Sequence, residues 1–188
     1  MTTDQKGAVA ELAIALAAVK LGIDVYRPVA EGGRYDLIFE IEDRLWRVQC
    51  KWAPRRGDVV IIRCYSSRRA SAGLVRRIYV PGEIDAFAAY CPQLNCCYFL
   101  PYPLFESRTE VALRVAPTRN NQKFGVNWAS EYEFGATLGR PGAVAQLGER
   151  ESGTLEVTGS IPVGSTSQAV RERGLRCRPD AQGLSSVS

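Results

Sequence analysis

The aromatic residues of this 188-residue chain end at Phe134. From about residue 139 onward, Gly, Ser, Thr and Arg dominate, and the apolar residues show no regular spacing. A segment of this composition cannot bury enough apolar surface to offset the conformational entropy that folding removes. We therefore predict one folded domain over residues 1–139, which is long enough to form a hydrophobic core, and a disordered tail over residues 140–188.

The tail also resembles a transfer-RNA gene that has been translated as protein. Residues 145–149 fit the codons of a D-arm, residues 159–162 fit those of a T-arm, and their separation matches the spacing of the two arms in such a gene. On this interpretation, the tail is a read-through of a neighbouring gene. An ordinary disordered tail is the alternative. Both interpretations predict no packed structure, so the tail is left out of the fold prediction.

Hydrophobic periodicity within residues 1–139 predicts a mixed α/β core. Residues 5–21 have helical spacing, because Val9, Leu12, Ala13, Leu16 and Val19 or Lys20 recur at steps of three and four residues. Residues 66–73 are interpreted as a polar, basic, mobile loop. Alternating segments predict a central sheet of four or five strands flanked by helices. The strands are expected at residues 23–27, 35–42, 45–52, 59–64, 77–80, 86–90, 96–100 and 111–115, with a turn or short helix at 101–105 and a last helix from 127 to 132.

The chain has no histidine, which excludes a Ser-His-Asp triad, a Cys-His dyad and any His-ligated zinc or haem. None of the six cysteines forms a C-x-x-C pair, which argues against a zinc ribbon or a thioredoxin-type site. Hydrolytic chemistry must therefore come from carboxylates, Lys, Cys, Ser or a metal ion held by oxygen ligands. The first four residues lack the basic region of a secretory signal, and the longest apolar run is too short to span a bilayer, so we expect a cytoplasmic protein with no membrane partner.

One group of residues combines oxygen ligands with an amine. Alternation along the strand 45–52 places Gln49 and Lys51 on one face. Counting back from the tight turn at residues 42–43 places Asp36 on the opposite arm of the hairpin, close to both. The Asp36 carboxylate, the Gln49 amide oxygen and the main-chain carbonyl of Cys50 are the kinds of ligand that Mg²⁺ takes. Beside such an ion, Lys51 would orient or deprotonate a water molecule.

Glu11 is the second carboxylate of this group. We expect it on the inward side of the first helix, where a carboxylate is costly unless it is paired or linked to a metal. Each residue also has an ordinary interpretation. Glu11 would then be a solvated helix residue, Asp36 a strand-edge residue beside a turn, and Gln49 and Lys51 members of a solvent-facing strand face.

Three short motifs occur in the order helix, hairpin strand, hairpin strand, and together they resemble the PD-(D/E)XK nuclease superfamily. The order resembles its Holliday-junction-resolvase-like branch, and most of all the homing endonucleases associated with group I introns, which carry Gln-x-Lys where most relatives carry Glu-x-Lys. The motifs are Lys6-Gly7-x-x-x-Glu11, Tyr35-Asp36-Leu37-Ile38 and Val48-Gln49-Cys50-Lys51, and Asn120-Asn121-Gln122 and Ala129-Ser130-Glu131-Tyr132 also resemble that group.

The resemblance implies a restriction-endonuclease-like core and hydrolysis of double-stranded DNA that depends on Mg²⁺ or Mn²⁺. For the homing group it also implies site-specific cleavage linked to a mobile intron. It implies Glu11, Asp36, Gln49 and Lys51 as catalytic residues, with the metal held by Asp36, Glu11, Gln49 and the Cys50 carbonyl. The chain departs from the pattern at two places: Tyr35 stands where the family name has Pro, and Gln49 stands where most relatives have an acid.

Basic residues gather directly after this group. From Lys51 to Arg77 there are eight basic residues and one acidic residue, Asp58, a local charge of +7 in a chain of net charge +4. Arginines bind phosphate oxygens in pairs of hydrogen bonds, and each neutralised phosphate releases counterions. A solvated basic loop is the alternative. We predict a DNA-binding surface that contains Arg55, Arg56, Arg63, Arg68, Arg69, Arg76 and Arg77.

Two other functions stay open on the sequence alone. The loss of an acid at Gln49 is compatible with a non-catalytic DNA-binding module that keeps the fold. The basic segment is also compatible with a protein that binds or cleaves RNA. If the chain does cleave DNA, one site per chain cuts one strand, so cutting both strands requires either two successive events or two chains in a homo-oligomer.

Overall fold

The structure, a computed structural model, describes residues 1–139 except residues 31, 72 and 119–123, and it leaves out the side chains of residues 68–70 and 74. The tail predicted over residues 140–188 and the motif at residues 120–122 therefore lie outside the described residues. Within the described ranges, no helix is long and apolar enough to span a membrane.

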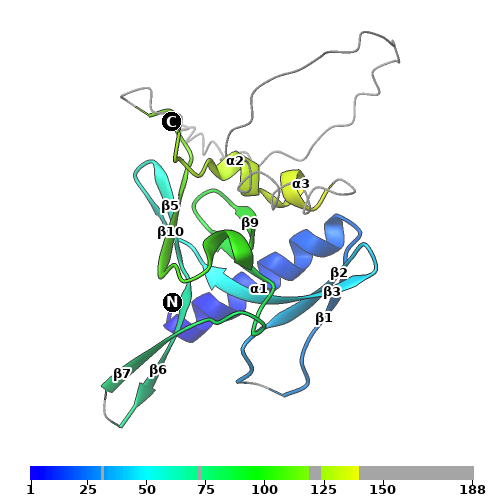
Figure 1. The fold of residues 1–188 in the computed structure, drawn as a ribbon, viewed down its shortest axis with the longest axis vertical. Coiled ribbons are helices and arrows are strands. Elements are labelled where there is room, and N and C mark those ends of the chain that lie inside the picture. The colour runs from blue at the N-terminus through cyan, green and yellow to red at the C-terminus, as the bar shows by residue number, and fades with distance from the viewer. Residues whose placement is uncertain (31, 72, 119–123, 140–188) are drawn as a thin grey trace, which may run out of the picture.

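A five-stranded mixed sheet forms the centre of the domain, with the strand order β1-β2-β3-β8-β9 (Figure 1). Strand β3 pairs in parallel with β8, and the other neighbouring pairs are antiparallel. This arrangement confirms the predicted α/β core, with five strands in its central sheet. The strands are β1 (Asp24–Tyr26), β2 (Leu37–Ile41), β3 (Arg44–Trp52), β8 (Ala86–Cys91) and β9 (Cys96–Pro101).

The β2–β3 hairpin follows from its sequence pattern. The apolar side chains Leu37, Phe39 and Ile41 are buried, and the residues between them are half-buried. Its two turn residues, Glu42 and Asp43, both have positive φ, 52° and 58°. Two-residue turns with positive φ at both positions match the right-handed twist of the strands that they join. The pairing starts with Leu37 opposite Val48, and this register determines what lies next to Asp36.

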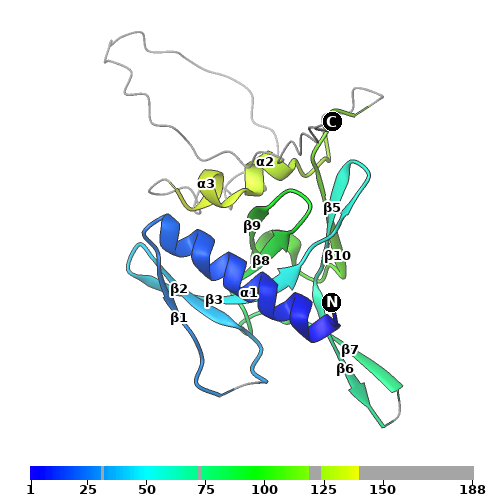
Figure 2. The same cartoon turned by 180° about the vertical axis from the view of Figure 1, so that it is seen from behind.

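Helix α1 (Thr3–Lys20) covers one face of the sheet (Figure 2). Thr2 and Gln5 form a capping box at its start. The residues that α1 buries are Ala10, Ile14 and Ala18, which are four positions apart and therefore on one side of the helix. Two of them are alanines, so the helix axis approaches the sheet closely.

The apolar stripe whose spacing predicts this helix is not the side that α1 buries. Val9, Leu12, Leu16 and Val19 are 37%, 62%, 56% and 58% exposed. Both sides of this helix are apolar, so periodicity alone does not show which side packs, and the side with small residues fits against the sheet. Glu11 is half-buried at the border between the two sides.

A second sheet packs against the face of the central sheet opposite α1. Its strand order is β10-β5-β4, and its buried side chains Val60, Ile62 and Leu113 share a core with Phe87 and Leu100. This sheet contains β4 (Arg55–Arg56), β5 (Val59–Arg63) and β10 (Glu110–Arg114), and the short helices are η1 (Tyr102–Phe105), α2 (Ala129–Tyr132) and α3 (Phe134–Thr137).

The strands β6 (Tyr65–Ala70) and β7 (Gly73–Ile78) form a separate hairpin that extends away from the two sheets (Figures 1 and 2). The prediction of a mobile loop over residues 66–73 is therefore wrong. Polar residues follow one another along these strands, so no alternation reveals them, and main-chain hydrogen bonds between the two strands hold the hairpin.

Candidate active site and nucleic-acid interface

The register of the β2–β3 hairpin places Asp36 beside Gln49. Asp36 directly precedes β2, and its main-chain N–H donates to the carbonyl of Val48 at 3.0 Å. Its carboxylate accepts the N–H of Cys50 at 2.8 Å, and Gln49 Nε2 donates to the same carboxylate oxygen. Burial raises the pKa of Asp36 above its ordinary value, while the Cys50 N–H and the Lys51 charge act in the opposite direction.

Gln49 is in contact with both of the other oxygen ligands predicted for this strand end. Besides the Asp36 carboxylate, its Nε2 contacts the carbonyl oxygen of Cys50 at 3.4 Å. A half-turn of the amide would exchange its nitrogen for its oxygen at the same position. Three oxygen-bearing groups therefore converge, and a carboxylate with two neutral oxygens fits an ion such as Mg²⁺, which takes one or two carboxylates and keeps several waters.

Acidic ligands are few at this place. Across the described part of the chain, no group of three or more His, Cys, Asp or Glu side chains is arranged to hold a metal ion. A metal site here would therefore depend on the neutral oxygens of Gln49 and Cys50 as well as on carboxylates.

Lys51 lies on the same face of β3 as Gln49, and its ammonium is held by two oxygens. Nζ donates to the carbonyl of Tyr65 at 3.0 Å and to the hydroxyl of Tyr79 at 3.2 Å. Burial lowers the pKa of Lys51 to about 8, while the charge of Asp36 acts to raise it. The site thus contains an amine that can exist in either protonation state near neutral pH.

Glu11 lies at the margin of this group. It forms an ion pair with Arg27 at 2.8 Å. The negative charge of Glu11 helps to raise the pKa of Cys50, and the positive charge of Arg27 acts on the pKa of Asp36. Arg27 therefore pairs with one carboxylate of the group and acts electrostatically on the other.

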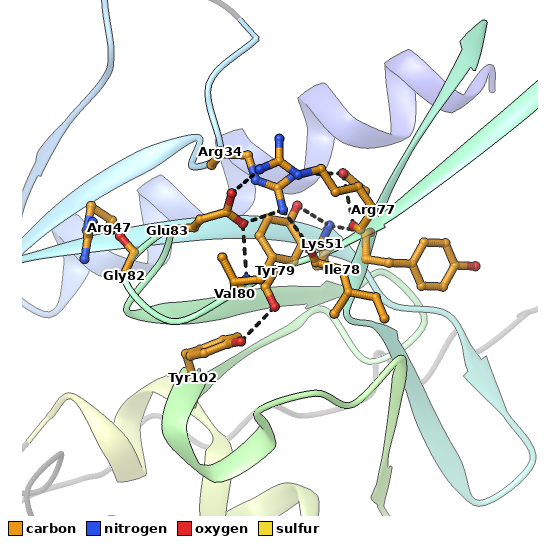
Figure 3. Close-up of polar contacts among 12 residues, drawn as sticks. Arg34, Arg47, Lys51, Arg77, Ile78, Tyr79, Val80, Gly82, Glu83 and Tyr102 are labelled. Atoms are coloured by element: carbon orange, nitrogen blue, oxygen red, sulfur yellow. Dashed lines mark hydrogen bonds and ion pairs between the residues drawn. The ribbon is translucent and has the colours of Figure 1, made fainter.

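Three neighbours of this site, Arg27, Arg34 and Tyr79, were not among the predicted residues. Arg27 follows β1, whose Tyr26 pairs with Ile38 of β2, so pairing the two predicted strands would have brought it close to Asp36. Arg34 lies over the ring of Tyr79, and Tyr79 contacts Lys51 (Figure 3). Tyr79 is 28 positions from Lys51, and no local pattern indicates their contact.

The predicted DNA-binding arginines lie on two elements at the same side of the central sheet, the three-stranded sheet and the β6–β7 hairpin (Figures 1 and 2). Arg55, Arg56 and Arg63 are exposed on β4 and β5. On β7, Arg76 is exposed and lies 5.1 Å from the ring centre of Tyr65, and Arg77 pairs with Glu83. The side chains of Arg68 and Arg69 are outside those that the structure describes.

The chain was compared with known protein families, curated proteins and solved structures. The sequence matches the family described as PD-(D/E)XK endonuclease over residues 1–135. Among solved structures, the domain is similar to a bacterial homing endonuclease, I-Ssp6803I, with a TM-score of 0.60 and 23% sequence identity over 82% of this chain and 100% of that chain. At this identity the likeness concerns the fold. No curated protein matches the sequence.

Proposed function

Because this chain belongs to the PD-(D/E)XK endonuclease family, we propose that it hydrolyses phosphodiester bonds of double-stranded DNA with the help of Mg²⁺ or Mn²⁺. One observation carries this proposal. The Asp36 carboxylate, the Gln49 amide and the Cys50 carbonyl converge at the end of the β2–β3 hairpin, beside the lysine of the Gln-x-Lys motif.

The oxygen donors at this place support a specific set of ligands for the cation. Asp36, Gln49 and the Cys50 carbonyl would hold it, and Glu11 would join them when its ion pair with Arg27 opens. A divalent cation in this place would polarise a phosphate oxygen and acidify a bound water molecule. Since Gln49 is neutral, we expect weaker cation binding than at a site with a second acid on this strand.

Lys51 would act directly on the reacting groups. Its charged form neutralises negative charge on a phosphate oxygen, and its neutral form accepts a proton from the attacking water. Because the pKa of Lys51 is about 8, its charged and neutral forms are both populated at mildly alkaline pH.

The two basic elements support duplex DNA as the substrate. Exposed arginines on β4, β5 and β7 would bind successive phosphates along a duplex. The Gln-x-Lys motif and the fold shared with a bacterial homing endonuclease support site-specific cleavage linked to a mobile intron.

The exposed stripe of α1 supports an oligomer. Val9, Leu12, Leu16 and Val19 have the three-four-three spacing of a coiled-coil seam. The stripe reads Val-Leu-Leu-Val from either end, so in two antiparallel copies Val9 would meet Val19 and Leu12 would meet Leu16, as a two-fold axis requires. We propose that a second copy packs here and supplies the site for the second strand. Sedimentation of a Leu12→Gln/Leu16→Gln variant tests this: an unchanged oligomeric state would contradict it.

A nicking assay tests the nuclease. The full chain is incubated with supercoiled plasmid, and with DNA carrying candidate intron insertion sites, with Mg²⁺, with Mn²⁺ or with chelator. Asp36→Asn, which keeps an acceptor for the Cys50 N–H, should reduce nicking roughly a thousandfold, and Lys51→Met should do so comparably. Glu40→Gln, on the same hairpin but hydrogen-bonded to Tyr26, should nick like wild type.

Two outcomes would replace the proposal. Wild type that binds DNA but nicks none of these substrates would show a non-catalytic binding module, the alternative that a neutral Gln49 in place of a second acid favours. If the chain binds structured RNA more tightly than duplex DNA in a competition at fixed salt concentration, RNA would replace DNA as the proposed substrate.

A further inference from the structure

Both ends of the β6–β7 hairpin contact the same lysine. Tyr65 begins β6, and its carbonyl accepts from Lys51 Nζ at 3.0 Å. Tyr79 directly follows β7, and its hydroxyl accepts from the same nitrogen at 3.2 Å. The ammonium of Lys51 is therefore held by the root of a hairpin that otherwise extends away from the sheets.

Tyr79 is held firmly at this root. It is 2% exposed, and its main-chain oxygen accepts from the hydroxyl of Tyr102 at 2.8 Å. The Arg34 guanidinium lies 4.1 Å from the centre of its ring, and Lys51 Nζ lies 5.0 Å from it. The ring thus contacts two cations, and its hydroxyl is turned to the cation that belongs to the candidate active site (Figure 3).

Arg34 joins the two strands of the hairpin to the body of the domain. Its Nη1 donates to Ser66 Oγ on β6 at 3.0 Å, and its Nη2 donates to the carbonyl of Ile78 on β7 at 3.0 Å. Nη2 also pairs with Glu83 at 2.7 Å, and Glu83 pairs in addition with Arg77 of β7. One guanidinium therefore fixes both strands at the point where they contact Lys51.

We propose that Tyr79 and Arg34 are positioning residues through which the root of the β6–β7 hairpin holds the ammonium of Lys51 beside Asp36. This inference rests on the proposed nuclease function and deepens it. The hairpin that presents arginines to DNA and the amine that acts on the phosphate then move as one unit. Contact of DNA with the hairpin is thereby transmitted to Lys51.

A purely structural tyrosine would need only its ring at this position. The Tyr79 ring packs against Phe87 with centroids 5.3 Å apart, and phenylalanine would keep that contact. What phenylalanine would lose is the hydroxyl, which contacts Lys51 and also Ser66 at the start of β6. Replacing Tyr79 by Phe therefore separates the positioning role from the packing role.

The first measurement compares the effect of a variant on the cleavage rate with its effect on the affinity for DNA. Tyr79→Phe should lower the cleavage rate at saturating DNA roughly tenfold, because a hydrogen bond to a charged group is lost, and should leave the Kd for DNA within about twofold. Tyr90→Phe is the matched control. It removes a hydroxyl from another tyrosine, bonded to Asn95 at the same distance of 3.2 Å, and should cleave like wild type.

The second measurement observes Lys51 directly. The chain has only four lysines, so an NMR spectrum of protein labelled with carbon-13 at the lysine ε position contains few signals. The signal that disappears in Lys51→Arg belongs to Lys51. Aromatic rings shift nearby nuclei, so the signal of Lys51 should differ from the others. Tyr79→Phe should move it, and Tyr90→Phe should not. Duplex DNA without metal should also move it in wild type, and much less in Arg34→Met.

These results separate the two proposals. Wild type that cleaves no DNA, together with a Lys51 signal that responds as described, supports the positioning role and overturns the nuclease. Active wild type, with Tyr79→Phe equal to it in cleavage rate and in the Lys51 signal, overturns the positioning role and leaves the nuclease proposal intact.

If Tyr79→Phe fails to fold, Arg34→Lys replaces it. This variant keeps the charge but loses the double contact to Ser66 and Ile78, and an unchanged rate and signal would overturn the inference.

Discussion

The β2–β3 and β6–β7 hairpins are both antiparallel pairs of strands, and they serve the site in different ways. The first lies inside the five-stranded sheet and buries every second side chain of β2. The second stands apart as a two-stranded sheet, with exposed arginines on β7. Packing on both faces fixes the relative positions of Asp36 and Gln49, whereas an unpacked hairpin presents charge to a partner. Lys51 belongs to the first hairpin by sequence and contacts the second through its ammonium.

The largest difference is expected in folding stability. Phe39 of β2 is fully buried, with ring centroids 6.3 Å from Phe99 and 6.2 Å from Phe134. Phe39→Ala should lower the free energy of unfolding by about 3–5 kcal/mol, because it removes buried apolar surface and leaves a cavity. Val75 of β7 is 44% exposed, and Val75→Ala should change stability by about 0.5 kcal/mol or less. Urea titrations of both variants measure this. Equal losses would show that the β6–β7 hairpin is packed as firmly as the sheet.

The next prediction concerns the buried amine where the two hairpins meet. Burial lowers the pKa of Lys51 to about 8 from an ordinary value of 10.5. Between these two pH values the unfolded chain binds more protons than the folded chain, so this lysine makes stability rise with pH across that window. The stability of wild type relative to Lys51→Met should therefore increase from pH 8 to pH 10.5, by on the order of 3 kcal/mol.

Chemical denaturation at a series of pH values measures that difference, and groups that titrate in both proteins cancel. Lys20→Met, which changes a lysine exposed on α1, is the control for removing a positive charge. Parallel pH profiles for wild type and Lys51→Met would mean that the ammonium is solvated and not held by the hairpin root.

The smallest effect is expected for a single arginine on the exposed hairpin. Arg76→Gln should remove one phosphate contact, weaken DNA binding roughly three- to tenfold at low salt, and reduce the slope of log affinity against log salt concentration by about one. The free energy of unfolding should stay within about 0.5 kcal/mol of wild type. Lys20→Gln removes a positive charge from the opposite side of the sheet and should leave the salt slope unchanged. A slope unaffected by Arg76→Gln would remove the hairpin from the DNA interface.

The part of the site that was predictable from the sequence is local. Alternation in residues 37–52 and the short turn between the strands predict the pairing that brings Asp36 next to Gln49, because a hairpin register depends on nearby residues alone. The buried face of α1 was not predictable in this way. Its leucine stripe and its alanine side have the same helical period, and the choice between them depends on how closely the sheet can be approached.

The surroundings of Lys51 depend on contacts between distant parts of the chain. Arg34, Tyr79 and Glu83 meet only because the connection after β3 returns to the sheet. The β6–β7 hairpin itself is held by main-chain pairing, which leaves no hydrophobic pattern in the sequence. A polar, arginine-rich segment is thus compatible with a loop and with a hairpin, and only the three-dimensional structure distinguishes them.

The parallel pairing of β3 with β8 requires one long connection, residues 53–85, and this connection contains β4, β5, β6 and β7. Every arginine predicted to bind DNA lies within it, while Glu11, Asp36, Gln49 and Lys51 all lie before it. The predicted DNA-binding arginines and the candidate catalytic residues therefore lie in consecutive stretches of the chain. Under the proposed function, a connection exchanged between relatives would change how the DNA backbone is held, and it would need a tyrosine where it rejoins the sheet to keep the contact with Lys51.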